Sequence, residues 1–258
     1  MLPMCYPADG DGFIPQWAMW YILELSEYLD RSGNAGFVAA AKNKVTNLMS
    51  YFEKYENSDG LLENLDGWNF VEWSKANDFV SGVNFPTNML YVMTLRTADK
   101  LYPGNGYAEK AKSLTETICK MSCINGFFHD QALRNETNVL YVTDSVTETC
   151  QYYAFFTGVA TRKTHADLLD KLVCEFGRKR EKTGLYKEVY PSNAFIGYFL
   201  WLEILAQNGY ISEMLCDIEE YFLPMADSTG TLWEMNAPSA SCNHGFTSYV
   251  MVLLNKYL

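Results

Sequence analysis

Acidic and aromatic side chains gather in four long loops of this 258-residue sequence. The loops are rich in Trp, Tyr, Asp, Glu, Asn and His, and they span residues 60–85, 126–145, 183–192 and 229–246. Carboxyl groups can act as general acid and general base, and aromatic rings can hold a sugar ring. An ordinary solvated loop carries fewer aromatic residues. The four loops therefore predict a carbohydrate site.

Helices must position these loops, and the sequence predicts nine of them. Their ends are marked by the stop signals that follow helices, such as Gly33 and the Pro103-Gly104 pair. Strand-like segments are few and short, at residues 126–129 and 138–142. The predicted helices cover residues 14–30, 35–56, 86–102, 107–121, 146–160, 166–178, 193–207, 211–222 and 245–258.

The helices recur in pairs with a period of about fifty residues. Long loops precede the helices that start near residues 86, 146, 193 and 245, at spacings of 60, 47 and 52 residues. If the first helix of each pair lies in an inner ring and the second in an outer ring, all long loops open on one face. The pattern predicts one all-α domain over residues 1–258, an (α/α)6-type helical toroid, with an open solenoid as the alternative. A closed six-pair ring needs about three more helices, so we expect the toroid to lack its N-terminal helices.

Composition excludes several classes of partner. A net charge of −11 disfavours nucleic acid, and no apolar run is long enough to span a membrane. The first twelve residues lack the pattern of a signal peptide. Seven cysteines occur without a CxxC pair or zinc-ligand spacing. We therefore expect a cytoplasmic protein with reduced thiols, no metal and no cofactor.

Several short motifs occur in a defined order along the chain. They are IPQW (14–17), FVEW (70–73) and, near the C-terminus, GTLWE (230–234) followed by SCNHG (241–245). In this order they resemble the catalytic domain of family 78 α-L-rhamnosidases, which are six-hairpin glycosidases. The C-terminal run looks like the closing signature of the family, FVEW looks like its F-x-D-W segment with Glu for the usual Asp, and IPQW resembles the helix that follows its catalytic loop. The resemblance covers nearly the whole chain and is strongest from Tyr190 to the end.

The resemblance implies an inverting hydrolase that releases terminal α-L-rhamnose with two carboxyl groups. Glu234 matches the position of the general base, and Trp233 and His244 match positions that contact the sugar. Trp73 and Trp17 match aromatic positions of the sugar subsite. Each of these residues also has a structural alternative, such as a Glu near a helix that pairs with an Arg or Lys, a core His or a core Trp.

Two further loop residues are candidates for substrate binding. Glu72 lies between Val71 and Trp73, where a carboxylate could contact substrate or bond to a neighbouring loop. Trp68 lies in a Gly-containing loop, where an indole can pack against a sugar. Neither assignment depends on a complete family motif.

The sequence departs from the family pattern at the general acid, and this affects the expected activity. The general acid of the family lies in a D-x-x-x-R-D-E-type segment, and these 258 residues contain no such segment. The chain alone should therefore be inactive or severely impaired unless a partner fragment supplies the acid. Alternatives are a sugar-binding fragment without turnover, a retaining glycosidase, a toroid lyase or a helical interaction scaffold. An exposed apolar flank predicts a homodimer or association with the missing N-terminal part.

Overall fold

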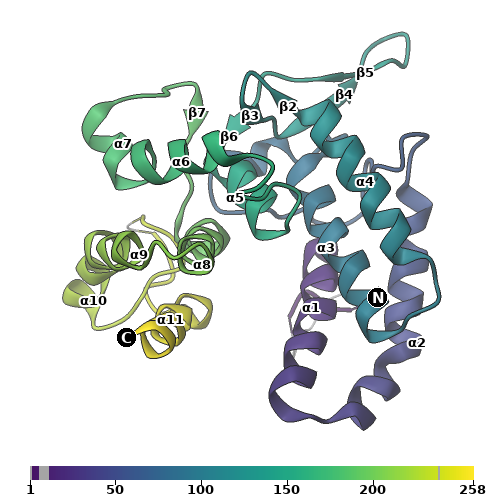
Figure 1. Ribbon diagram of the computed structural model, residues 1–258, viewed down its shortest axis with the longest axis horizontal. Helices are drawn as coiled ribbons and strands as arrows, with labels where there is room; N and C mark the ends of the chain where they lie inside the picture. The colour runs from purple at the N-terminus through teal and green to yellow at the C-terminus, as the bar shows by residue number, and fades with distance from the viewer. Residues whose placement is uncertain (1, 6–11, 238) are drawn as a thin grey trace. The chain divides into compact units, whose positions relative to one another are not determined.

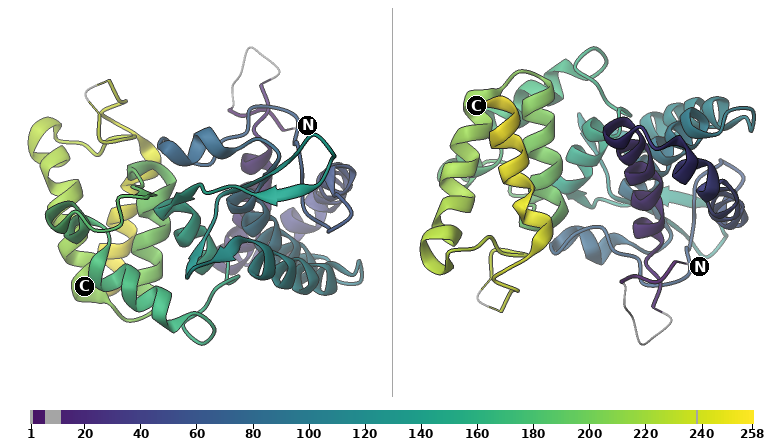
Figure 2. Two further views of the ribbon diagram at one scale, coloured as in Figure 1. Left: turned by 90° about the horizontal axis from the view of Figure 1, so that it is seen from above. Right: turned by 90° about the horizontal axis from the view of Figure 1, so that it is seen from below.

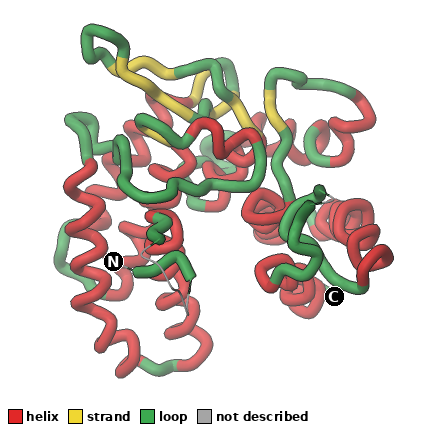
Figure 3. Tube along the Cα trace, turned by 180° about the vertical axis from the view of Figure 1, so that it is seen from behind, coloured by secondary structure: helices red, strands yellow, loops and turns green. Residues whose placement is uncertain are grey.

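The computed structural model describes residues 2–5, 12–237 and 239–258, and it divides into two compact units. Unit 1 comprises Met1–Val71, Phe79–Ile124 and His129–Asp144, and unit 2 comprises Glu72–Asp78, Asn125–Phe128 and Ser145–Leu258. Helices dominate both units, with short strands between them (Figure 3). The absence of a signal peptide was predicted from residues 1–12, and most of them lie outside the described residues.

Unit 1 contains four long helices and a small sheet (Figure 1). Helix α3 packs against both α1 and α4. In the sheet, β4 lies between β1 and β5 and pairs with both in antiparallel register. The elements of unit 1 are α1 (Pro15–Ser32), α2 (Ala35–Phe52), α3 (Phe85–Leu101), α4 (Tyr107–Ser122), β1 (Val83–Asn84), β2 (Cys123–Ile124), β4 (Gln131–Arg134) and β5 (Leu140–Val142).

Local signals explain where these helices start and stop. Helix α1 ends at Gly33, whose φ of 66° lets its N–H bond to the Leu29 carbonyl oxygen. Helix α3 begins with the Asn84 side chain accepting a hydrogen bond from the Thr87 N–H at 2.9 Å, and Pro86 occupies its first turn. These two helix boundaries agree with the predicted ones to within two residues.

Unit 2 contains shorter helices joined by irregular segments. One of these segments, Ile218–Phe222 between α9 and α10, is a single π-helical turn, whereas Ala194–Tyr198 before α8 is kinked, with non-helical backbone angles at Phe195 and Ile196. Strands β6 and β7 pair in parallel. The elements of unit 2 are β3 (Phe127–Phe128), β6 (Val146–Thr147), α5 (Glu148–Phe156), α6 (Ala166–Glu175), α7 (Arg178–Thr183), β7 (Val189–Tyr190), α8 (Phe199–Gln207), α9 (Ile211–Asp217), α10 (Leu223–Thr229) and α11 (Tyr249–Tyr257).

The C-terminal helices of unit 2 lie side by side (Figure 2). Helix α8 contacts both α9 and α11, and α9 runs into α10 through the π-turn. The core-facing sides of these helices bury Leu200, Leu202, Leu205, Met225 and Leu253. Burial of such side chains contributes about 1.5–3 kcal/mol each. This packing fixes the start of α8, which follows one loop of unit 2, and the ends of α10 and α11, which flank another.

The structure corrects the starts of two predicted helices and adds one helix that was not predicted. The helix predicted over residues 193–207 becomes regular only at Phe199, because Phe195 and Ile196 have non-helical backbone angles. The helix predicted from Val146 starts at Glu148, because residues 146–147 form strand β6. Helix α7 was not predicted, and it spans the residues between the helix predicted over 166–178 and the loop assigned to 183–192.

Candidate active site

The loop that joins α10 to α11 carries Glu234 and His244. Two backbone hydrogen bonds close it: Glu234 N–H to the Ser241 carbonyl oxygen at 2.9 Å, and His244 N–H to the Leu232 carbonyl oxygen at 3.1 Å. They bring His244 Nε2 to 4.0 Å from Glu234 Oε1, with side chains 29% and 22% exposed. Both groups can therefore meet a ligand from solvent. The sequence motifs that contain these two residues thus form one local structure.

Trp73 anchors the Glu234 carboxylate from a distant part of the sequence. Its indole Nε1 donates a hydrogen bond to Glu234 Oε1 at 2.8 Å. No described residue donates a hydrogen bond to Oε2. One carboxylate oxygen is thus held in place, and the other is left to accept a proton or a hydroxyl hydrogen bond from a ligand.

His244 is oriented mainly by packing. The Phe195 ring contacts it edge-on, with ring centroids 4.8 Å apart. Its Nδ1 is buried and has no hydrogen-bond partner among the described residues. A buried polar nitrogen without a partner is costly.

Asn193 connects the segments that carry Trp73 and Glu234. Its Nδ2 donates to the Trp73 carbonyl oxygen at 2.9 Å. Its Oδ1 accepts hydrogen bonds from the Asn236 N–H at 2.8 Å and the Tyr221 hydroxyl at 2.9 Å. In the sequence, Asn193 stands at the start of the helix predicted over residues 193–207, where Asn is typical of a helix cap. No local pattern indicates the bonds to residues so distant in sequence.

Glu72 lies beneath these groups and is fully buried. Its Oε1 accepts the N–H groups of Asn193 at 2.5 Å and Gly197 at 3.1 Å, and its Oε2 accepts the Thr149 hydroxyl at 2.7 Å. Burial raises the pKa of Glu72 to about 7, although these donors and the Ser74 hydroxyl lower it. With its oxygens occupied by protein donors, the carboxylate is placed to support the site rather than to contact a sugar.

A second buried carboxylate, Glu148, lies on the first turn of α5. Its Oε2 accepts the Ser192 N–H at 2.9 Å, and its Oε1 lies 3.2 Å from the Arg180 guanidinium. Burial raises the pKa of Glu148, while Arg180 and backbone donors oppose the shift. Glu148 and Glu72 thus accept the successive N–H groups of Ser192 and Asn193.

The remaining predicted tryptophans occupy three different settings. Trp233 donates from its indole to the Thr229 hydroxyl at 2.8 Å and lines a pocket of about 130 Å³ with Tyr221 and Asn236. In unit 1, Trp17 and Trp68 each contact the ring of Phe70, with centroids 5.5 and 5.6 Å apart. Trp68 is 47% exposed. Trp17 is half-buried in α1.

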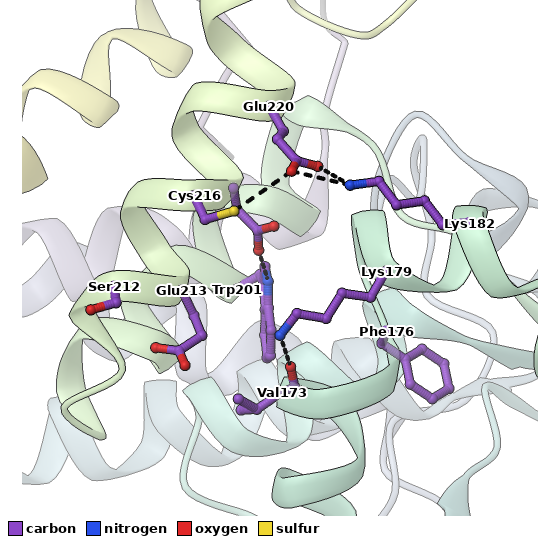
Figure 4. A pocket seen from close by; sticks show the side chains of 10 residues that line it. Val173, Phe176, Lys179, Lys182, Trp201, Ser212, Glu213, Cys216 and Glu220 are labelled. Atoms are coloured by element: carbon purple, nitrogen blue, oxygen red, sulfur yellow. Dashed lines mark hydrogen bonds and ion pairs between the residues drawn. The ribbon is translucent and has the colours of Figure 1, made fainter.

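A larger pocket of about 320 Å³ lies over α6, α7 and α9 (Figure 4). Two pairs of its polar side chains bond to each other, Lys182 with Glu220 and the Trp201 indole with Asp217, and Lys179 donates to the Val173 carbonyl oxygen. None of the predicted site residues lines it. We therefore place the candidate site at Glu234, where a carboxylate oxygen is available, and not in the larger pocket.

Among the described residues, no three His, Cys, Asp or Glu side chains are grouped so that they could hold a metal ion. Within the same ranges, no helix is both long enough and apolar enough to cross a membrane. All cysteines are free thiols.

Comparison with known proteins gives structural matches only. No protein-family model and no curated protein matches the sequence. The chain is similar to the crystal structure of a GH78 family rhamnosidase of Bacillus sp. GL1, with a TM-score of 0.82, 22% identity and coverage of 98% of this chain and 27% of that one. It is also similar to a rhamnosidase from Klebsiella oxytoca with rhamnose bound, with a TM-score of 0.73, 14% identity and coverage of 98% and 49%.

These matches concern the fold. The chain spans 27% and 49% of the length of the two rhamnosidases. Nearly the whole chain superimposes on a part of each, although few residues are identical. The predicted helical fold class and the predicted resemblance to family 78 rhamnosidases are thus confirmed at the level of structure: the chain has the fold of a part of these rhamnosidases.

Proposed function

We propose that this chain carries the base-bearing part of an inverting glycoside hydrolase for terminal α-L-rhamnosides. The observation that supports the proposal most strongly is the placement of Glu234. Trp73 fixes one of its oxygens at 2.8 Å, and the other accepts no hydrogen bond from the described residues. The fold shared with two rhamnosidases, one of them with rhamnose bound, supports the choice of sugar.

In the proposed reaction, Glu234 Oε2 accepts a proton from a water molecule as the water oxygen attacks the anomeric carbon. The bond to the leaving group breaks on the opposite face of the sugar, so the configuration inverts. His244 and Trp233 contact the sugar hydroxyls and ring. Trp73 contributes by holding Glu234, and its half-buried ring contributes a sugar contact. Trp17 and Trp68 remain candidates for contacts in unit 1.

The leaving group determines how much a general acid matters. An alcohol leaves poorly unless its oxygen is protonated, and these residues contain no counterpart of the acid segment of the family. Fluoride leaves without prior protonation of a glycosidic oxygen. We therefore expect this chain to hydrolyse α-L-rhamnosyl fluoride much faster than an alkyl α-L-rhamnoside.

A second candidate function is sugar binding without turnover. The lack of an acid segment favours it for natural alkyl rhamnosides. The two candidates share the same site and differ in whether Glu234 activates water. Activity toward the fluoride separates them, since a pure binding module would not accelerate its hydrolysis.

Binding of L-rhamnose tests the site itself. We expect Trp73→Phe to weaken the binding about tenfold, because Phe cannot donate the hydrogen bond that holds Glu234. We expect a similar loss for His244→Ala. The measurement is isothermal titration calorimetry of each variant with L-rhamnose.

The matched control is Trp20→Phe in α1, which makes the same chemical change at a tryptophan outside the Glu234 cluster. Its affinity for L-rhamnose should equal that of the parent chain. Circular dichroism should confirm that all variants are folded. Equal affinity of Trp73→Phe, His244→Ala and the parent would place the sugar elsewhere.

A further inference from the structure

The segment between β7 and α8, which Figure 1 locates, contains residues with unfavourable backbone angles. Ile196 has φ 71° and ψ −65°, the angles of a γ-turn that a β-branched residue rarely adopts. Ile196 is also fully buried. Such strain persists only where the surrounding structure fixes it. The segment is therefore held in place by contacts outside itself.

Two buried carboxylates supply those contacts. Glu148 accepts the N–H of Ser192, and Glu72 accepts the N–H groups of Asn193 and Gly197, one on each side of Ile196. A side chain at position 197 would collide with Glu72 Oε1, so only glycine fits there. The hydrogen bond to Glu72 thus fixes the backbone of Asn193 independently of the contacts of its side chain.

The side chain of Asn193 uses this fixed position to join two other segments. Its Nδ2 bonds to the carbonyl oxygen of Trp73, and its Oδ1 bonds to the N–H of Asn236, two residues after Glu234. The Tyr221 hydroxyl donates to the same Oδ1, and the Tyr221 ring stacks on Tyr198 with centroids 3.9 Å apart. One amide therefore contacts both segments that meet in the Trp73–Glu234 hydrogen bond.

We propose that Asn193 is a positioning residue that sets the hydrogen bond between Trp73 Nε1 and Glu234 Oε1. It acts through its two partners and does not touch the sugar. Its importance for catalysis rests on the proposed function, whereas its control of the Trp73–Glu234 contact does not. Only an amide fits the position, because it donates to the Trp73 carbonyl and accepts from the Asn236 N–H with one planar group.

The test follows the indole N–H signal of Trp73 in a sugar-free chain labelled with ¹⁵N-tryptophan. Trp73→Phe identifies the signal by its disappearance, and Glu234→Gln shows how far the signal moves when a neutral acceptor replaces the carboxylate. We expect Asn193→Ala to shift or broaden this signal and to weaken L-rhamnose binding about three- to tenfold. Asn193→Asp keeps the acceptor but loses the donor, so it should shift the same signal even if Asn193→Ala fails to fold.

The control is Asn88→Ala in α3. Asn88 is also fully buried, and its side chain bonds to the backbone of Leu62 and Asn84. It should lower stability and leave the Trp73 signal unchanged. A folded Asn193 variant with an unchanged Trp73 signal would overturn the proposal. If the signal shifts in the Asn193 variants but the parent does not bind L-rhamnose, the positioning role stands and the proposed function fails.

Discussion

Replacement of Glu234 by Gln is expected to slow hydrolysis of α-L-rhamnosyl fluoride by this chain about 10²- to 10⁴-fold. Gln keeps the size of Glu, and its amide oxygen can still accept the Trp73 indole N–H, which lies 2.8 Å from Oε1 in the parent. It cannot take a proton from water. The rate should therefore fall while L-rhamnose affinity changes only a few-fold, as measured by fluoride release and by calorimetry.

The control for this prediction is Glu203→Gln on α8. Glu203 makes a surface hydrogen bond to Gln207 at 3.1 Å and has no part in the Glu234 cluster. It removes the same charge from the same unit, so it reports any effect of net charge on turnover. Rates for Glu234→Gln that match those of Glu203→Gln would rule out Glu234 as the general base.

Replacement of Glu72 by Ala is expected to cost the most stability of any change at the site. It leaves the N–H groups of Asn193 and Gly197 without their buried acceptor, at about 1–3 kcal/mol each. It also opens a cavity beside the strained turn at Ile196. Urea unfolding followed by circular dichroism measures the loss. The rhamnose affinity of the folded fraction should fall as well.

The pH dependence of the stability of the Glu72→Gln variant separates the effect of the carboxylate charge from that of side-chain packing. Burial raises the pKa of Glu72 from its ordinary value of 4.5 to about 7. Between these values the folded protein binds more protons than the unfolded chain, so the free energy of unfolding falls as pH rises through this window. The ionised carboxylate thus costs up to about 3 kcal/mol above pH 7, and the cost disappears below pH 4.5.

Gln carries no charge, and its amide can still accept the two backbone N–H groups and donate to the Thr149 hydroxyl. We therefore expect Glu72→Gln to gain stability relative to the parent as pH rises from about 5 to about 7.5. Unfolding curves at several pH values in this range provide the measurement. A constant difference between the two proteins across this range would mean that Glu72 titrates normally.

Much of the fold was predictable from local signals. The predicted end of α1 and the predicted start of α3 agree with the structure because Gly33 ends α1 and Asn84 and Pro86 begin α3 by local geometry. The predicted start of α8 was wrong. The residues of its expected first turn donate backbone hydrogen bonds to Glu72, which lies more than a hundred residues away in the sequence. The spacing of apolar residues in a helix gives no indication of such a distant hydrogen-bond acceptor.

The candidate site was predictable only in part. The resemblance to family 78 nominated Glu234, His244 and Trp73, which the structure brings together. Asn193 was missed because its contacts are tertiary. Glu72 was nominated for substrate binding, and burial of a carboxylate among backbone donors is not visible in a sequence. The roles proposed for Trp233, Trp17 and Trp68 in sugar binding stay predictions.

The stereochemistry of α-L-rhamnosyl fluoride hydrolysis tests the central claim most directly. Proton NMR can follow the first anomer released by this chain, before mutarotation mixes the two forms, with Glu234→Gln run in parallel. Water activated by Glu234 should give β-L-rhamnose first, and the variant should give almost no product. Release of α-L-rhamnose first, or equal turnover by the chain and the variant, would contradict an inverting mechanism with Glu234 as the base.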